Sequence, residues 1–427
     1  MVPRILLLVT PHTYRAQSFA AAARKLGIDL VYGVDLPPQL AEMWNVPLAL
    51  DFRHPEKAAD EIAAFAQHTP LDAVLATDDS GTLVAAYANA RLGLPGNDPK
   101  AALAARNKYV MRTLLAEGGV PVPAFRLVHA DDDPTRLAQE VAYPVVVKPL
   151  LMSGSRGVIR ADDPEAFVAA FNRLRRLLPA TETLPGERNI LIETYLPGVE
   201  VALDGLLIDG VLHILAIFDK PDPLEGPFFE ETIYVTPSRL PAETQAAIHT
   251  TTQQAVRALG LRHGPVHAEL RINDEGVWLI EAAGRTIGGL CSSILQFGVD
   301  VCLEEVVLCH AAGLPLPPLE QAPGAAGVMM IPIPRAGILR GYRGVEEAKA
   351  VPLIEDVVIT ARLHYPLVPL PEGESYLGFI FARGETPEEV EAALHQAHAC
   401  LHFEIEDPLP VLNEPFLPTI LNDEKEE

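Results

Sequence analysis

Cysteine, aromatic residues and positive charge are all scarce in this sequence. Only four of its 427 residues are cysteines, Cys291, Cys302, Cys309 and Cys400, and no two have CxxC spacing. The first three fall in an apolar segment that we expect to be helical, so packing is favoured over metal binding as their role. Aromatic residues make up 6% of the chain and hydrophobic residues 49%, which is typical of a globular protein.

Basic side chains number 33 against 57 acidic ones, so the formal net charge is −24. A chain with a large net negative charge repels nucleic acids and anionic membranes, so we expect neither as a partner. Long hydrophobic runs are also missing, because no stretch reaches the roughly 18 apolar residues of a membrane span. The apolar run at the N-terminus is too short for a signal peptide, so we expect a cytoplasmic protein.

Residues 4–98 alternate strand and helix patterns, which predicts an α/β domain with an open, doubly wound sheet. Ligands bind such sheets beyond the carboxyl ends of the strands, where Asp78 and Asp79 follow one predicted strand. An N-cap for the next helix is the favoured role of these two residues. No GxGxxG follows the first strand, so a dinucleotide is not expected. The expected strands are Arg4–Val9, Asp29–Gly33, Leu48–Leu50 and Ala73–Ala76, and the expected helices are Ala16–Leu26, Ala58–Gln67 and Gly81–Leu92.

A break at 94–99, LPGNDP, predicts a domain boundary. Lys100–Glu117 follows as one expected helix, with Lys108 in its middle. Lys148 lies among β-branched residues in the predicted strand YPVVVKP, where a buried lysine is unusual and snorkelling to the surface is the alternative. The next loop, Met152–Val158, is rich in glycine and serine and could present backbone N–H groups to phosphate. A plain hairpin turn explains that loop nearly as well.

Two stretches further on carry pairs of glutamates. Glu193 and Glu200 bracket the turn in ILIETYLPGVE, where an apolar cleft at a strand end could hold a purine. Glu269 and Glu281 lie on two apolar runs joined by the turn Asn273–Gly276, so a hairpin would place them near each other. Two facing carboxylates are costly to bury unless a cation such as Mg²⁺ lies between them. The alternative is a solvent-facing hairpin whose charges lie on the wet side.

The end of the chain has a separate pattern. An apolar, predicted helical region extends to Ala312, and a Pro- and Leu-rich linker covers 313–324. Strands near Ala326–Ile333, Val357–Leu363 and Tyr376–Ala382 and a helix at Pro387–Leu401 then predict a small α+β module.

The order of these signals resembles the ATP-grasp superfamily over roughly Pro99–Gly313. The stretches EAAGRTIGG at 281–289, GVMMIPIPRAG at 327–337 and PLPEGESYLGFIFARG at 369–384 look most like the bacterial L-amino acid ligases. The resemblance implies an α/β N-terminal domain (1–98), an α+β ATP-grasp fold of two subdomains clasping ATP (99–313), and a small α+β C-terminal module (325–421). The ATP lid would cover about 123–196 and the large subdomain about 197–313.

The resemblance also implies residue roles. Lys108 and Lys148 would contact the α- and β-phosphates, Glu269 and Glu281 would bind Mg²⁺, with Mn²⁺ as an alternative, and Arg285 would meet the carboxylate substrate or the developing oxyanion. A further metal ligand that many family members carry as Asn is Ala283 here, which puts a second metal in doubt. The implied phosphate loop consists of Ser153, Gly154, Ser155 and Gly157, the adenine hinge of Glu193, Thr194, Tyr195 and Leu196, and the ribose contact of Glu200.

The resemblance implies amide formation between a carboxylate and an amine, both of them small molecules and, in the L-amino acid ligases, amino acids. The carboxylate attacks the γ-phosphoryl group of ATP to give an acyl phosphate, and the amine then displaces phosphate, leaving ADP and phosphate as by-products. The loops Met152–Val158 and Asp219–Pro237 would keep water out. A homodimer is compatible with this reading. The alternatives are another ATP-grasp ligase, of the purine-biosynthesis or biotin-carboxylase kind, and a non-catalytic ATP-binding regulatory protein.

Overall fold

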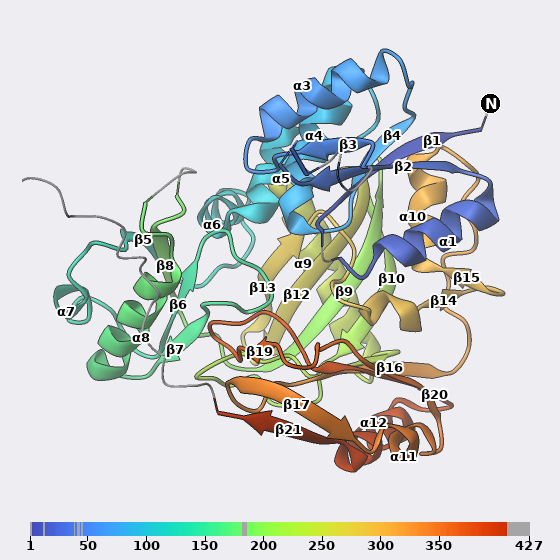
Figure 1. Ribbon diagram of the computed structural model, residues 1–427. Coiled ribbons are helices and arrows are strands. Elements are labelled where there is room, and N and C mark those ends of the chain that lie inside the picture. Colours follow the sequence, from blue (N-terminus) through green and yellow to red (C-terminus); the bar gives the residue numbers. More distant parts are fainter. Residues whose placement is uncertain are drawn as a thin grey trace, which may run out of the picture.

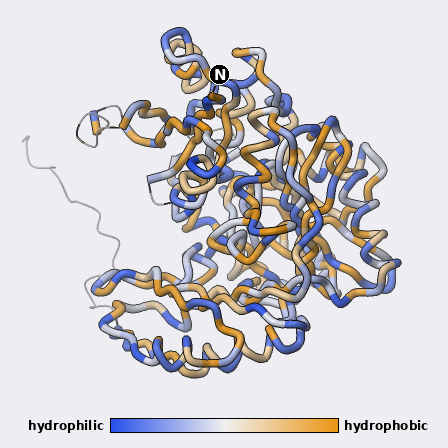
Figure 2. Tube along the Cα trace, turned by 90° about the vertical axis from the view of Figure 1, so that its right-hand side faces the viewer, coloured by the Kyte–Doolittle hydropathy of each residue, from blue (hydrophilic) through white to orange (hydrophobic). Residues whose placement is uncertain are grey.

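The computed structural model describes residues 2–407, apart from positions 12, 38, 41, 42, 44, 45 and 182–185. The chain forms an N-terminal domain, a lid and a large body that the C-terminal segment completes (Figure 1). In that described part, no helix combines the length and apolar character needed to cross a bilayer. Apolar and polar residues alternate along the helices and strands, as expected for elements with one buried face (Figure 2).

The N-terminal domain is a four-stranded parallel sheet in the order β3-β2-β1-β4. Its central strand β1 is an apolar run buried along nearly all of its length, as a strand covered on both faces requires. The predicted α/β domain is therefore confirmed. Its elements are β1 (Arg4–Val9), α1 (Ala16–Leu26), β2 (Asp29–Asp35), β3 (Leu48–Leu50), α3 (Pro55–Ala66), β4 (Ala73–Ala76) and α4 (Asp79–Leu92).

The predicted single helix Lys100–Glu117 is wrong, because the chain forms α5 (Pro99–Arg106) and α6 (Lys108–Glu117). Asn107 between them has an extended backbone, and its side chain accepts hydrogen bonds from the N–H groups of Tyr109 and Val110. Asparagine is among the strongest N-cap residues, which explains the break. Lys108 is therefore the first residue of a helix rather than a residue in the middle of one.

The lid is an antiparallel sheet in the order β5-β8-β6-β7, lying at the left of Figure 1. Helix α8 covers one face of it and buries Phe167 and Phe171 in the lid core. Strands β5 and β7 and the short helix α7 were not foreseen from the sequence. The lid elements are β5 (Phe125–His129), α7 (Pro134–Leu137), β6 (Val145–Pro149), β7 (Ile159–Ala161), α8 (Pro164–Leu177) and β8 (Asn189–Thr194).

The body is an eight-stranded sheet in the order β13-β12-β9-β10-β11-β16-β20-β18. Its last three strands come from the C-terminal module, so the module continues the ATP-grasp sheet through the antiparallel pairing of β11 with β16. Pairing of this kind covers the open edge of β11. The strands are β9 (Val199–Ile208), β10 (Val211–Asp219), β11 (Ile233–Thr236), β12 (Gly264–Asn273), β13 (Gly276–Ala283), β16 (Ala325–Ile331), β18 (Ile354–Ile359) and β20 (Gly378–Gly384).

The apolar region before Ala312 is helical only in its second half, in α10 (Leu303–Ala311). The first half forms the 3₁₀ helix η1 (Cys291–Ile294) and a small hairpin of β14 (Gln296–Phe297) and β15 (Val301–Cys302). Gly298 and Asp300 in this hairpin have positive φ angles of 51° and 58°, which a helix cannot accommodate. Of the first three cysteines, only Cys309 therefore lies in an α-helix.

The remaining elements cover the body. Helix α9 (Ala242–Leu259) packs against β10 and β13, and α12 (Pro387–Cys400) packs against β16 and β20. A separate three-stranded sheet, β19-β17-β21, was not foreseen from the sequence. Its strands are β17 (Gly337–Arg343), β19 (Pro366–Leu367) and β21 (His402–Glu406). Helix α11 (Val345–Lys349) packs against α12 and β18. Residues 408–421 of the predicted module lie outside the described part of the chain.

One hydrophobic core joins the N-terminal domain, the body and the C-terminal strands. It includes Phe19 of α1, Phe218 of β10, Val307 of α10 and Phe379 of β20, each at most 2% exposed. The N-terminal sheet and the C-terminal strands therefore pack on one side of the body, while the lid has a core of its own.

Candidate active site

A pocket lies where the lid, the hairpin β12–β13 and the start of α6 meet, and it encloses about 950 Å³ including its mouth. Among the predicted residues, Gly157 alone is absent from the pocket wall. The predicted residues that line it are Lys108, Lys148, Ser153, Gly154, Ser155, Glu193, Thr194, Tyr195, Leu196, Glu200, Glu269, Glu281 and Arg285.

The Gly/Ser loop, residues 152–158, has the backbone form of an anion-binding turn. Gly154, Ser155 and Gly157 have positive φ angles of 61°, 55° and 73°. Successive residues of this kind turn backbone N–H groups toward one side of the loop. Gly157 lets the loop pack closely against α8, because a Cβ at this position would lie only 2.9 Å from Leu174 Cδ1. The predicted conformation of a phosphate loop is thus available here.

Glu269 and Glu281 are directly paired across the β12–β13 ladder, as the sequence predicted. Both line the pocket, and their side chains are 24% and 28% exposed. Like charges directly opposite each other destabilise a sheet. This pair is therefore expected to need a cation nearby.

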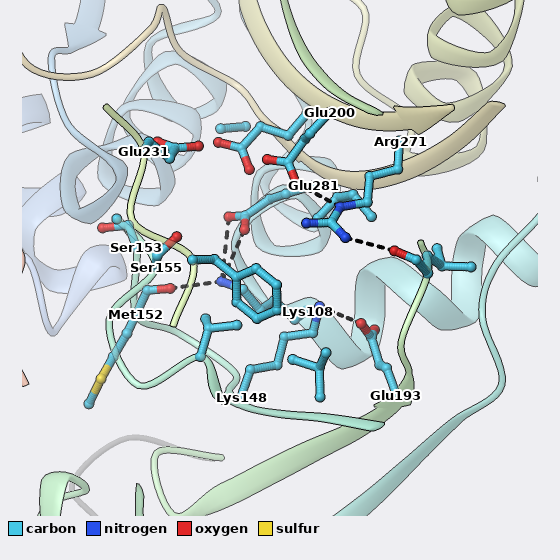
Figure 3. Close-up of a pocket in the computed structure, with 18 of the residues that line it drawn as sticks. Lys108, Lys148, Met152, Ser153, Ser155, Glu193, Glu200, Glu231, Arg271 and Glu281 are labelled. Atoms are coloured by element: carbon cyan, nitrogen blue, oxygen red, sulfur yellow. Dashed lines mark hydrogen bonds and ion pairs between the residues drawn. The ribbon is translucent and has the colours of Figure 1, made fainter. Parts of the chain in front are cut away.

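Lys108 is one cation beside this pair. It is 6% exposed, and its Nζ lies 2.7 Å from the carbonyl oxygen of Met152 and 3.3 Å from Glu281 Oε2 (Figure 3). The start of α6 places it there, because the first residue of a helix can extend away from the helix end. Lys108 therefore connects the Gly/Ser loop to the hairpin.

Lys148 is also buried, at 6% exposure, so the snorkelling alternative is wrong. Its ammonium group forms an ion pair with Glu193 (Figure 3). The other Glu193 oxygen accepts a hydrogen bond of 2.6 Å from Arg112 Nε. Burial lowers the pKa of Lys148, with Arg112 and Lys108 acting in the same direction against Glu193. Burial alone would raise the pKa of Glu193, but Arg112 and Lys148 outweigh burial and lower it.

Arg112 was missed by the sequence reasoning. It lies four residues after Lys108 on α6, and its Nη2 donates to the carbonyl oxygen of Ile280 at 2.6 Å. Residues four apart share one face of a helix, so the spacing of the two cations was an available signal.

The mouth of the pocket has an aromatic wall. The rings of Tyr195 and Phe229 are stacked with centroids 6.3 Å apart, and the Arg160 guanidinium lies 4.1 Å from the Tyr195 centroid. Arg271 of β12, also missed, donates to the carbonyl oxygen of Leu196 at 2.7 Å and to Glu200 at 2.8 Å (Figure 3). The hinge after β8 is therefore held by a buried guanidinium that is 4% exposed.

A second charged cluster also lines the pocket. Glu200, Glu231 and Glu269 each have an oxygen within 4.8 Å of the others, a grouping that could hold a metal ion. In the structure the Lys220 ammonium lies among them, 2.8 Å from Glu200 and 3.8 Å from Glu269. Burial opposes the charge on Lys220, but these three carboxylates raise its pKa well above the usual value. Burial and the charge on Glu269 raise the pKa of Glu231 to about 7.

His267 stands two residues before Glu269, on the same face of β12. Its Nδ1 lies 2.7 Å from Asp204 and its Nε2 lies 3.7 Å from Glu269. Burial lowers the pKa of His267, but the hydrogen bonds to Asp204 and Glu269 outweigh burial and raise the pKa to about 9. Glu269 thus has two basic neighbours that the sequence did not single out.

Arg285 reaches the N-terminal domain. Its Nη2 donates to Asp79 Oδ2 at 2.6 Å, and its Nη1 donates to the carbonyl oxygen of Thr286 at 2.9 Å. The predicted N-cap position is borne out for Asp78, although its side chain makes no capping bond, and is wrong for Asp79, which is the first residue of α4. Asp78 occupies the N-cap position of α4 without a side-chain bond to the helix and accepts instead from Thr10 and Thr77, while Asp79 pairs with Arg285. Only the folded chain brings the start of α4 next to Arg285, which follows β13.

Three family models match the chain. They describe the ATP-grasp N-terminal domain at residues 19–96, the ATP-grasp domain at 141–294, and the L-amino acid ligase C-terminal domain 2 at 329–406. The predicted three-part fold class agrees with this order of matches.

Individual relatives agree with the family models. An alanine–anticapsin ligase of Bacillus amyloliquefaciens is 30% identical over 333 residues, covering 72% of this chain and 70% of that protein. The crystal structure of an L-amino acid ligase from Bacillus licheniformis superposes with a TM-score of 0.76 at 27% identity, covering 95% of this chain and 99% of that chain. A phosphoribosylglycinamide synthetase from Anaerococcus prevotii shares the fold, with a TM-score of 0.66 at 16% identity over 95% of this chain and 100% of that one. On these matches, and on the site just described, the chain belongs to the ATP-grasp superfamily and, within it, to the L-amino acid ligases.

Proposed function

We propose that this protein uses ATP to join two amino acids through an amide bond, releasing ADP and phosphate. One observation carries the proposal: two nearly buried lysines, a facing pair of glutamates and an arginine line the same pocket. Binding adenine requires none of these charges. Transferring a phosphoryl group to a carboxylate, in contrast, requires groups that stabilise the negative charge on both the ATP phosphates and the attacking carboxylate. The alanine–anticapsin ligase and L-amino acid ligase relatives carry amide-forming names, which supports the same reaction.

The nucleotide is assigned to the lid side of the pocket. The apolar wall of Tyr195 and Phe229 suits a purine, and Arg271 and Lys220 hold Glu200 where it could accept from a ribose hydroxyl. Positive φ angles in the Gly/Ser loop support a phosphate contact there. The proposed ATP-binding residues are Lys108, Lys148, Ser153, Gly154, Ser155, Gly157, Glu193, Thr194, Tyr195, Leu196 and Glu200.

The donor set of Glu269 and Glu281 fits Mg²⁺, or alternatively Mn²⁺. Both side chains offer hard carboxylate oxygens, and their direct opposition across the ladder is relieved by a divalent cation. When bound, the ion neutralises phosphate charge during phosphoryl transfer. Ala283 supplies no oxygen from its side chain, so these two glutamates are the metal ligands that we assign.

Arg285 and Asp79 are assigned to positioning the carboxylate substrate. Arg285 is assigned to the substrate carboxylate, because a guanidinium fork pairs with a carboxylate through two parallel bonds. Asp79 orients that fork. The carboxylate oxygen attacks the γ-phosphoryl group, forming an acyl phosphate and ADP, and the amine then attacks the acyl carbon so that phosphate leaves. The Gly/Ser loop and the segment 219–237 exclude water from this intermediate.

A screen of amino-acid pairs tests the proposal. The purified protein is incubated with Mg²⁺, ATP and each pair, and ADP and the amide product are quantified together. Equal amounts of ADP and a dipeptide with at least one pair are expected. ATP binding without ADP would favour a regulatory role, and ADP with bicarbonate in place of an amine would favour a carboxylase-like member of the superfamily.

The domain division is part of this proposal. We assign 1–98 to the N-terminal domain, 99–313 to the ATP-grasp domain with its lid at about 123–196, and 325–421 to the C-terminal module. A homodimer and a cytoplasmic location stay predictions, which sedimentation and cell fractionation would check.

A further inference from the structure

A short segment of the C-terminal module, Pro371–Glu374, lies against the lid. The Gly157 N–H donates to the carbonyl oxygen of Pro371 at 2.8 Å, and Arg156 Nε donates to the carbonyl oxygen of Glu372 at 3.0 Å. Both donors belong to the Gly/Ser loop. The segment, which we call the strap, therefore contacts the back of the loop whose front lines the pocket.

The strap also binds the lid through a forked ion pair. Glu372 accepts from Arg173 Nε at 2.5 Å and from Arg173 Nη2 at 2.8 Å. The hydrogen bond from Arg173 lowers the pKa of Glu372 below its usual range. Arg173 lies on α8, which packs against β6 and β7 on either side of the Gly/Ser loop. Two-bond pairs of this kind fix direction as well as distance.

The other end of the strap is anchored in the body. Tyr376 follows it, with its ring centroid 6.4 Å from that of Phe379, and Phe379 is 2% exposed in the shared core. The Phe379 ring also meets Tyr14, which follows β1, at 6.2 Å. The strap thus runs from a rigid part of the molecule to the lid (Figure 1, between β19 and β20).

We propose that Glu372 is a positioning residue for the reaction: the strap holds the Gly/Ser loop in its closed place over the pocket. The proposal rests on the proposed function for its catalytic consequence. Without the fork, the loop opens more often, which weakens nucleotide binding and admits water. Water then attacks the acyl carbon of the acyl phosphate, the bond from that carbon to the phosphate oxygen breaks, and phosphate and the original carboxylate are released. ATP is then consumed without amide formation.

Glu372→Gln tests the strap, because it keeps the side-chain volume and removes the charge. The matched control is Glu140→Gln, which removes the 2.7 Å ion pair with Arg126 elsewhere in the lid. Both carboxylates are similarly exposed, at 40% and 41%. Binding of a non-hydrolysable ATP analogue is measured by calorimetry, trypsin cleavage after Arg156 is timed, and the ratio of ADP to amide is recorded.

For Glu372→Gln we expect about fivefold weaker analogue binding, faster cleavage after Arg156, and an ADP-to-amide ratio of about two or more. Glu140→Gln should match the wild type in all three. The exchange variant Arg173→Glu with Glu372→Arg should restore most of the binding. Unchanged binding and cleavage in Glu372→Gln, or a loss of thermal stability with no change in either, would overturn the proposal. A wild-type protein that forms no amide, together with weakened binding in Glu372→Gln, would refute the ligase assignment and leave the strap standing.

Discussion

Arg285→Lys is the substitution that best separates a ligase from a protein that only binds ATP. Arg285 is 13% exposed and uses two nitrogens, one for Asp79 and one for the Thr286 carbonyl oxygen. Burial opposes its charge, but Asp79 outweighs burial and raises its pKa, so the group stays protonated throughout the usual pH range. A lysine at this position is also charged but has a single nitrogen. The substitution therefore changes geometry and leaves net charge constant.

The expected magnitude follows from the lost fork. A lysine can satisfy Asp79 or a substrate carboxylate but cannot present two parallel bonds, so we expect kcat/KM for the carboxylate substrate to fall about 100-fold, or ~2.7 kcal/mol. ATP affinity should stay within about threefold, because Arg285 belongs to the substrate side of the site. Asp79→Asn retains an acceptor and removes its charge, and we expect about a tenfold loss.

The losses of kcat/KM caused by Arg285→Lys and by Asp79→Asn should not be additive. If Asp79 acts by orienting Arg285, the combined variant should be about as slow as Arg285→Lys alone. ATP titration by calorimetry, amide-forming kinetics and thermal melts on the same three variants would decide. A parallel fall of ATP binding and melting temperature in Arg285→Lys would mean that Arg285 only braces β13 against α4, and the assigned substrate role would be refuted.

Three further results are expected. Glu281→Gln should lower turnover about 1,000-fold while its circular dichroism melt stays close to that of the wild type, because it removes one charge from the assigned metal site. Excess EDTA should stop ADP formation, and added Mg²⁺ or Mn²⁺ should restore it. Glu193→Gln should lower the free energy of unfolding by about 3 kcal/mol at pH 7, since it leaves Arg112 and Lys148 buried without their partner. The pKa of Glu193 is lowered by folding, so the wild type's advantage should be complete above its unfolded value of about 4.3 and vanish as pH falls through the folded pKa, as denaturant melts at several pH values would show.

Local chemistry determined the parts of this protein that were predictable. The alternation of apolar runs and helical patterns predicted the N-terminal elements, because β1 is buried along its continuous apolar run from Ile5 to Val9. The turn Asn273–Gly276 predicted the β12–β13 hairpin and placed Glu269 and Glu281 close to each other, but it would by itself pair Glu269 with Ile280. A register shift between Glu269 and Leu270, which the sequence did not reveal, brings Glu269 directly opposite Glu281. The isolated lysine of β6 was visible as a charge among β-branched residues. Each of these signals is carried by neighbours in the sequence.

Tertiary structure decided the partners of those residues. Neither the ion pair of Arg285 with Asp79 nor the entry of Lys220 among three glutamates could be predicted, because the residues involved come from distant strands and loops. The joining of β16 to β11 and the contact of Glu372 with the lid likewise depend on how whole layers pack. Periodicity determines which face of an element is buried, but which element covers that face depends on the global fold. The sequence therefore supplied the charged groups of the site, and the packing of the lid, body and N-terminal sheet determined how they are paired.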